Sequence, residues 1–468
     1  MEVELLCRVV SLVLAAGFWM AQGQQAVDQK PADQNSNDQQ AEDQQSQDQL
    51  SQGPSILSRD TSLVSQPPGR VIDFRYYAEI TGIYDTGLVP LTTNAQGNLV
   101  NAGAASGVET GFGIQGTRRW KRNRLSLEYK GAYRKYSTNA VVEGLDEFLN
   151  LRYSHEISRR LTLDLKETVG SVSLSNGAFS YLPLTSTDLF ALPANELFDI
   201  RTRFAQSRVD LTWRKSERLS FSVGGEGFVV RRSSFLLAGL DGYDAHAMVA
   251  YRLTRHQTVS ADYDHTYFDF ERTFGNARLQ SASLGYSVAL NRRWEMSLRG
   301  GGVRINALGI MQVPISPAIA AILGVNYANV TFNATTYAPL EQASLTRNFE
   351  RASLTFSYLA GATPGNGLYL TSRQATGSTA YTYTGYRRWT FGVHGGYGEL
   401  SAIGQNLGAY SNVEGGAGAT YRVGRETHIQ LRYDYRHYTI HDSIYQKDSS
   451  RVSLGLAFSP GETPLRIW

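Results

Sequence analysis

Apolar and polar side chains alternate along most of the chain beyond residue 70. In "RLSLEYKGAY", Leu125, Leu127 and Tyr129 fall on one face of an extended strand, and Ser126 and Glu128 fall on the other. Helical spacing is nearly absent, so the pattern predicts an all-β chain. The same period of two returns in "VDLTW" (209–213), "LSFSV" (219–223), "ASLTFSY" (352–358), "HIQLRYDYRHY" (428–438) and "RVSLGLAF" (451–458).

Short polar connectors separate neighbouring alternating stretches, and most of them are basic. An eighth connector, "GATPGN" from Gly361, is predicted to be a turn by its glycine and proline rather than by charge. The seven basic or polar connectors are "RRWKRN" from Arg118, "SRR" from Ser158, "RKSER" from Arg214, "TRH" from Thr254, "NRR" from Asn291, "YRRW" from Tyr386 and "VGRE" from Val423.

Longer and less regular links alternate with these connectors. The chain is therefore expected to make tight turns at one end of its strands and long loops at the other. Eight tight turns, with one strand before the first and one after the last, predict 18 strands, and a count from 16 to 20 fits the same pattern. The longer links lie around residues 85–105, 139–144, 174–199, 233–241, 271–275, 309–346, 371–376, 400–409 and 439–449.

This arrangement is typical of a transmembrane up-and-down antiparallel β-barrel. From about Val71 to Phe458 the chain resembles the porin-like barrels of the bacterial outer membrane, in architecture rather than in any specific motif. The resemblance implies short turns on the periplasmic side and longer outer loops. It also implies a last strand that ends in an aromatic residue, as at Phe458, although "SPGETPLRIW" continues the chain to Trp468.

The N-terminal region predicts export. The apolar segment from Val9 to Ala21 is too short to span a membrane comfortably, and small residues follow it, as in a secretory signal peptide. Glu2 and Glu4 beside a single Arg8 depart from that type, which leaves a buried N-terminal helix as the alternative. The only cysteine, Cys7, would leave with the signal, so the mature chain could form no disulfide or thiolate site.

A repeat beginning "DQKPADQNSN" follows and has almost no apolar side chains, so it is expected to stay disordered. We predict four segments: a signal peptide over 1–23, a Gln- and Asp-rich pentapeptide-repeat tether over 24–69, an outer-membrane barrel over 70–460, and a C-terminal extension over 461–468.

A soluble β-sandwich could show similar alternation, but a chain of this length would need several domains, and no linker follows Arg70. Trp120, Trp213, Trp294 and Trp389 lie at or beside tight turns, where a membrane-interface girdle would place them. Tryptophan also often caps the edge of an ordinary sheet, which is the alternative to the favoured girdle interpretation. The basic turns would face lipid headgroups, and their scatter around a rim argues against nucleic-acid binding.

If the apolar faces point outward, the polar faces line the interior, because 18 strands enclose more space than side chains fill. Both signs of charge are present, so charge selectivity cannot be predicted, and many of these residues could simply pair across neighbouring strands. The predicted lumen-lining residues are Arg75, Lys130, Arg134, Arg152, Arg208, Asp210, Arg252, Asp264, Arg299, Arg432, Asp434 and Arg436.

Two long links, Ala178–Phe198 and Ile310–Phe332, are unusually apolar for water-exposed loops. We expect at least one of them to fold into the mouth of the barrel and narrow it. Alternatively, they pack on each other above the rim, and the second could hold an extra hairpin.

An enzymatic function has little support in the sequence. The histidines, such as His155, His265 and His394, fall singly along strands without metal-ligand spacing. "GFGIQG" at 111–116 matches a dinucleotide-binding fingerprint in letters only, because it lies within a strand and opens no helix. Neither a catalytic set nor a cofactor is predicted.

The leading functional prediction is an outer-membrane channel for passive diffusion of small hydrophilic solutes. The alternative is an export conduit or envelope-assembly barrel whose tether binds periplasmic partners. The expected partners are outer-membrane lipid, the barrel-assembly machinery and the solutes, and a homo-oligomer is left open. An energised receptor is disfavoured because 22 strands and a plug do not fit this length.

Overall fold

The computed structural model describes the chain from residue 72 to residue 459, with gaps. The predicted signal peptide, tether and C-terminal extension lie outside the described residues. So does the apolar link 178–198, together with the central part of the link 310–332. The described residues are 72–86, 92–93, 99–100, 104–137, 144–173, 201–234, 237–314, 327–404, 408–441 and 446–459.

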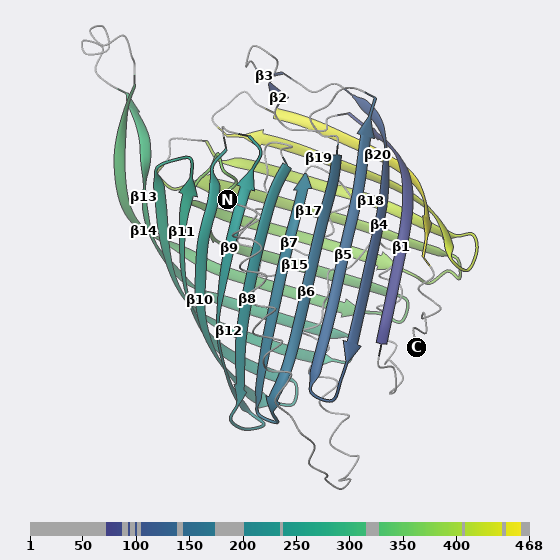
Figure 1. The fold of residues 1–468 in the computed structure, drawn as a ribbon, viewed down its shortest axis with the longest axis horizontal. Helices are drawn as coiled ribbons and strands as arrows, with labels where there is room; N and C mark the ends of the chain where they lie inside the picture. The colour runs from purple at the N-terminus through teal and green to yellow at the C-terminus, as the bar shows by residue number, and fades with distance from the viewer. Residues whose placement is uncertain are drawn as a thin grey trace, which may run out of the picture. The chain divides into compact units, whose positions relative to one another are not determined.

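Eighteen antiparallel strands form a closed barrel, which confirms the predicted fold class and strand number (Figure 1). β1 (Ile72–Asp85) closes it, because it pairs with β4 (Ala105–Arg119) on one side and with β20 (Gln446–Phe458) on the other. The short strands β2 (Thr92–Thr93) and β3 (Leu99–Val100) form a separate hairpin between β1 and β4.

Every other barrel strand pairs with its neighbours in the sequence, so the topology is a simple meander. The remaining strands are β5 (Asn123–Tyr136), β6 (Gly144–Ser158), β7 (Leu161–Ser173), β8 (Arg201–Arg214), β9 (Leu219–Arg232), β10 (Gly239–Thr254), β11 (Gln257–Glu271), β12 (Gly275–Asn291), β13 (Trp294–Pro314), β14 (Tyr327–Asn348), β15 (Ala352–Thr363), β16 (Ser372–Tyr383), β17 (Trp389–Ala402), β18 (Tyr410–Arg422) and β19 (Thr427–Ile440).

The connections differ at the two ends of the barrel, as predicted. Seven of the eight predicted tight turns lie where expected, and we call their end of the barrel the turn end and the opposite end the loop end. The turn-end connections are residues 120–122, 159–160, 215–218, 255–256, 292–293, 349–351, 384–388 and 423–426.

The predicted positions of strands and links between residues 309 and 376 were wrong in detail. The predicted link 309–346 contains most of β14, and all but the first residue of the predicted link 371–376 lies in β16. The turn-end connection here is 349–351, where the amide of Phe349 donates to the carbonyl of Ala352, whereas "GATPGN" begins a loop-end connection. Glycine and proline mark where a chain bends, but they do not show at which end of a strand the bend lies.

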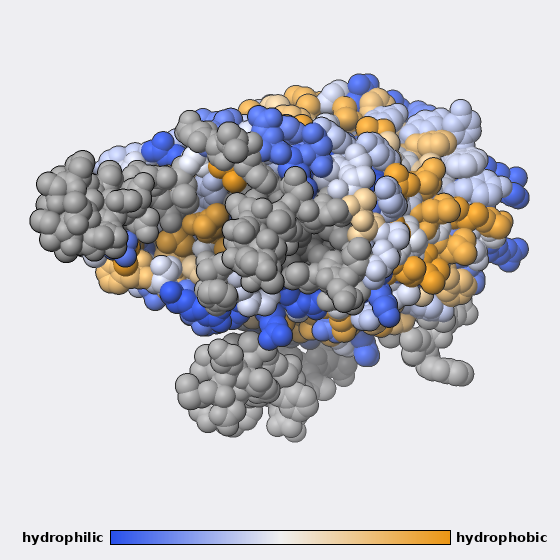
Figure 2. Space-filling model, turned by 90° about the horizontal axis from the view of Figure 1, so that it is seen from above, coloured by the Kyte–Doolittle hydropathy of each residue, from blue (hydrophilic) through white to orange (hydrophobic). Residues whose placement is uncertain are grey.

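The two faces of the sheet carry different side chains, and register fixes which residues share a face. Large apolar residues of one face are strongly exposed, among them Leu284 (67%) and Leu454 (58%). We call this face the outer wall and the opposite face the inner wall. Figure 2 shows apolar residues in orange, interspersed with polar residues, on the side seen from above.

Glycines make room for large inner-wall side chains. A Cβ on Gly113 would overlap the ring of Tyr77, and one on Gly107 would overlap the ring of Tyr136. Close approach of an aromatic ring therefore explains glycine at these two positions in and near "GFGIQG". Within the described part of the chain, no helix is long and apolar enough to cross a membrane.

Candidate functional site

All twelve predicted lumen-lining residues lie on the inner wall. The register links them from strand to strand: Arg75 pairs with Gln115, which pairs with Glu128, two residues before Lys130. Where β19, β20 and β1 lie side by side, Asp434 pairs with Arg451, which pairs with Asp85 of β1. Their side of the wall follows from strand pairing, and their role in a pore remains a prediction.

The most buried charge on the inner wall is Arg134, whose side chain is 1% exposed. Its Nε lies 2.6 Å from Oε2 of Glu109, and its guanidinium also donates to Asp146. Arg201 Nη2 lies 3.4 Å from the other oxygen of Asp146. These strands, β4, β5, β6 and β8, are thus joined by a buried ionic network rather than by isolated pairs.

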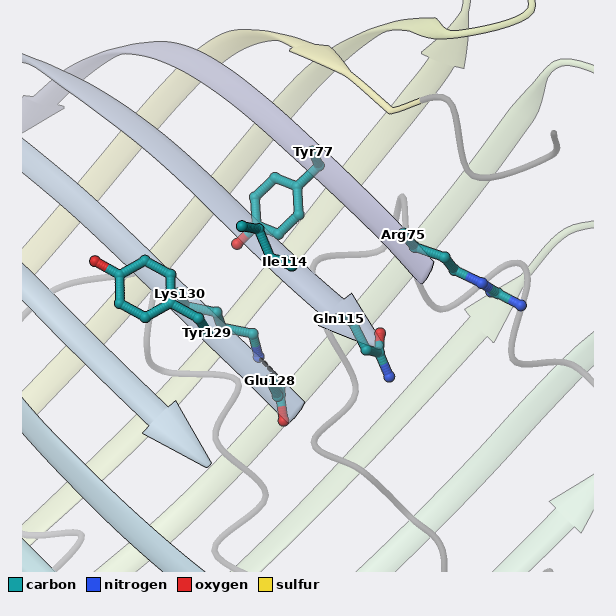
Figure 3. Close-up of a pocket in the computed structure, with 7 residues that line it drawn as sticks. All are labelled: Arg75, Tyr77, Ile114, Gln115, Glu128, Tyr129 and Lys130. Carbon is teal, nitrogen blue, oxygen red and sulfur yellow. Dashed lines mark ion pairs between the residues drawn. The ribbon is translucent and has the colours of Figure 1, made fainter. Parts of the chain in front are cut away.

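A small pocket lies toward the turn end of β1, β4 and β5 (Figure 3). Nζ of Lys130 is 2.7 Å from Oε1 of Glu128, and both side chains are almost fully buried. Arg75 and Gln115 extend beside this pair in the close-up, toward the same end of the strands. Lys130 is therefore held by a neighbour on its own strand, two residues away.

A second ionic group lies on β8 and β10. Nε2 of His246 lies 2.6 Å from Oδ1 of Asp210, and Nδ1 lies 3.2 Å from Oδ1 of Asp244. Arg208 also binds Asp210, with Nε 2.7 Å from Oδ2. Gly224 lies between them, because a Cβ there would overlap both Asp210 and His246.

The remaining predicted residues are also engaged. Nη2 of Arg299 lies 3.1 Å from Asp262 and 3.9 Å from Asp264, and Arg152 lies 3.5 Å from Asp164. The last contacts lie on β17–β20 and β1, where the pairs are Arg432 with Asp434 (2.7 Å), Arg436 with Glu414 (3.4 Å), Arg451 with Asp85 (3.1 Å) and His394 with Asp434 (3.4 Å). Arg252 lies on the same wall, opposite Thr258.

Sequence reasoning missed an apolar region of the inner wall at the loop end. Phe204, Phe228 and Phe268 are 3%, 2% and 0% exposed and belong to one apolar cluster of β5–β14. The sequence did contain a sign of this region. Phe204 and Arg208 lie four residues apart in β8, so they share one face of the strand, opposite the outer-wall residues. The interior is thus polar only in part.

The connection between β15 and β16, residues 364–371, is folded inward. The amide of Ala238, which precedes β10, donates to the carbonyl of Gly367 at 3.1 Å, although β10 lies five strands away from β15. Leu370 packs on the apolar cluster of the inner wall. Gly365 (φ 77°) and Gly367 (φ 88°) supply the left-handed backbone that this tight path requires.

Tyr369 anchors the inward connection from its other side. Its hydroxyl donates to the carbonyl of Gly408 at 2.7 Å, and its ring lies 6.5 Å from that of Tyr410. Burial raises the pKa of the Tyr369 hydroxyl. The connection therefore spans part of the barrel mouth and contacts the rim on both sides, although its sequence predicted only a tight turn.

The inner wall of β14–β16 is different again, with small uncharged side chains. Ser344, Ser357 and Ser378 share one row of the ladder, and Ser378 is exposed although it faces inward. The hydroxyls of Ser357 and Ser378 lie 2.6 Å apart. Exposed inward-facing hydroxyls show that this part of the barrel is not filled by the described side chains.

No set of three or more His, Cys, Asp or Glu side chains within the described ranges has the geometry of a metal site. The ionic groups instead pair arginine, lysine or histidine with carboxylates, some within one strand and others between strands, which is chemistry suited to holding a wall together.

Comparison with known proteins finds similarity only to solved structures of low sequence identity. No family model matches the chain, and no curated protein matches it. Among solved structures, it is similar to OccK5 (OpdH) of Pseudomonas aeruginosa, with 12% identity, a TM-score of 0.41, and coverage of 83% of this chain and 98% of that one. A BenF-like porin from Pseudomonas fluorescens Pf-5 has 9% identity, a TM-score of 0.44 and the same two coverages.

Proposed function

We propose that this protein is a bacterial outer-membrane channel for passive diffusion of small hydrophilic solutes. The observation that carries the proposal is a closed 18-stranded barrel with apolar side chains exposed outside and hydroxyl side chains exposed inside. Such a body can reside in lipid because the closed ladder satisfies its backbone hydrogen bonds. An open interior then offers water and solutes a route through it.

The outer wall supports a membrane location. Its exposed apolar side chains, such as Val393 (55%) and Leu431 (53%), would be unfavourable in water over so large an area. Exposed aromatic residues mark the turn end, with Trp120, Trp213 and Trp389 beside tight turns. Membrane-interface girdles have this position in transmembrane barrels.

Exposed tyrosines lie farther along the strands toward the loop end, and they include Tyr84, Tyr133, Tyr243 and Tyr433. Near the turn end, the guanidinium of Arg118 lies 4.7 Å from the Trp120 ring centre and that of Arg347 lies 4.7 Å from the Trp294 ring centre. A basic side chain over an interfacial ring is suited to contact with lipid phosphate. We infer that the turn end faces the periplasm.

The inward connection 364–371 is the segment we assign to the constriction. The apolar links expected for that role, 178–198 and 310–332, lie wholly or in part outside the described residues, and the ends of the second belong to β13 and β14. Among the described loop-end connections, this buried one contacts the rim at Ala238, five strands away, and so narrows the mouth. This favours a filter for small solutes over a conduit for folded proteins.

Liposomes that contain the purified protein test the proposal. Swelling in small hydrophilic solutes should be faster than in protein-free liposomes and should slow as solute size increases. Removal of residues 24–66 should leave the swelling rate unchanged if the protein is a diffusion channel. If it is an export conduit, the same deletion should abolish export in cells. A barrel that conducts neither ions nor solutes in the bilayer would contradict the proposed function.

A further inference from the structure

A continuous row of hydroxyl side chains crosses six neighbouring strands of the inner wall. Each member is the register partner of the next, from β11 to β16. Adjacent strands lie about 4.8 Å apart, so the row is roughly 24 Å long. We call it the hydroxyl row, and its members are Thr258, Ser287, Ser297, Ser344, Ser357 and Ser378.

The row climbs along the barrel as it goes around. Ser297 lies three residues from Trp294, the turn-end residue of β13, whereas Gly396, the next position after Ser378, lies seven residues from Trp389 of β17. This rise follows from strand tilt, because a row perpendicular to tilted strands is oblique to the barrel axis. The hydroxyl row therefore leads from the turn end toward the middle of the barrel.

The row is accessible and chemically uniform. Ser287, Ser297 and Ser378 are exposed, and Ser344 and Ser357 are half-buried. Neighbouring hydroxyls lie within reach of each other, at 3.3 Å between Ser287 and Ser297 and 2.6 Å between Ser357 and Ser378. Beyond Gly396 the same row reaches Glu414 and Arg436, which pair with each other at 3.4 Å.

We propose that the hydroxyl row is the path along which small uncharged polyhydroxylated solutes cross the turn-end half of the barrel; this rests on the proposed channel function and names its substrate class. Each serine hydroxyl donates one hydrogen bond and accepts two. A solute with several hydroxyls can therefore replace its lost water contacts stepwise along the row. The members of the row carry no charge. Arg252 lies opposite Thr258 at the turn-end start of the row, and the Glu414–Arg436 ion pair lies beyond its other end, so the serines between them offer little to a net charge on the solute.

A competing explanation is that serine is present only because it is small. Alanine has nearly the same volume and no hydroxyl, so the variant S344A/S357A/S378A separates the two explanations. The matched control is S126A/T212A/S222A, which removes inner-wall hydroxyls on β5, β8 and β9 that lie outside the row and bond in separate pairs. Both variants should retain the heat-dependent gel mobility of a folded barrel.

The experiment measures liposome swelling with sorbitol and with glycine betaine, which has no hydroxyl, together with KCl conductance, for the full-length protein and both variants. The row variant should lose roughly five-fold in the sorbitol rate, the value for about one hydrogen bond, with unchanged betaine rate and conductance. The control should retain all three. An unchanged sorbitol rate in the row variant, or an equal loss in the control, would overturn the proposal while leaving the channel intact.

A cysteine test locates the path independently of the solute. The only natural cysteine, Cys7, can be replaced by serine, so one cysteine can be introduced at a time. A bulky thiol reagent should lower the conductance of Ser357→Cys and leave that of Ser126→Cys, whose side chain is buried, unchanged. Equal block at both positions would contradict a path along the hydroxyl row, and absence of any wild-type conductance would instead refute the proposed function.

Discussion

The inner wall of β4–β6 and the inner wall of β13–β16 face the same interior but differ in what they expose. The first is built from charged side chains that are nearly inaccessible, such as Arg134 at 1% and Glu128 at 2%. Toward its turn end, the second carries short hydroxyl side chains, of which Ser297 and Ser378 are exposed. Buried charge inside this barrel therefore marks where the wall is held together, and exposed hydroxyls mark where the described wall is open.

Removal of Arg134 should have the largest effect on stability. Arg134→Ala leaves Glu109 and Asp146 close together, buried and without their shared cation, which is expected to cost roughly 3–5 kcal/mol. Urea unfolding of the barrel in detergent micelles measures the loss. A change below about 1 kcal/mol would show that this region is hydrated and would remove the contrast between the two walls.

The two faces of the sheet should tolerate a new arginine differently. Leu431→Arg lies on the outer wall and should destabilise the protein by roughly 2–4 kcal/mol if it lies near mid-membrane. Ser357→Arg points into the open part of the interior, so it should cost much less and should lower conductance by obstruction. Folding in lipid vesicles at increasing urea concentrations measures both, and equal costs would contradict the assignment of the two faces.

The inward connection 364–371 should influence conductance more than stability. Tyr369→Phe removes one hydrogen bond to the Gly408 carbonyl and should cost about 0.5–1.5 kcal/mol locally. Replacement of Asn366–Leu370 by two glycines should free the mouth and raise single-channel conductance. Tyr435→Phe, on the outer wall, is the control for the loss of a tyrosine hydroxyl in Tyr369→Phe. Unchanged conductance in the variant with the shortened connection would refute the constriction.

The smallest effect is expected from single changes in the hydroxyl row. Ser344→Ala should alter unfolding free energy by no more than about 0.5 kcal/mol, because its surroundings are open and its volume hardly changes. The same urea titration used for Arg134→Ala measures it. A cost of several kcal/mol would mean that this wall is packed as tightly as the charged one.

Much of the architecture could be predicted from the sequence. Alternation is a local property, since each residue's side follows from its neighbours along one strand, and it predicted the outer face of Leu431 and the inner face of all twelve charged candidates. The strand number, 18, followed from the count of tight turns. The basic connectors predicted seven of the eight turns. The stretch 309–376 was misassigned because a local turn signal does not define which end of the barrel it serves.

The alternation of apolar and polar residues and the short polar connectors thus determined the strands, their two faces and the difference between the barrel's two ends. Only the tertiary structure decided that residues 364–371 fold inward, that Phe204, Phe228 and Phe268 form an apolar inner patch, and that serines of five successive strands fall in one row. These features depend on inter-strand register and on contacts between distant strands. No local pattern encodes them, because the stagger that aligns one strand with the next is set by closure of the whole barrel.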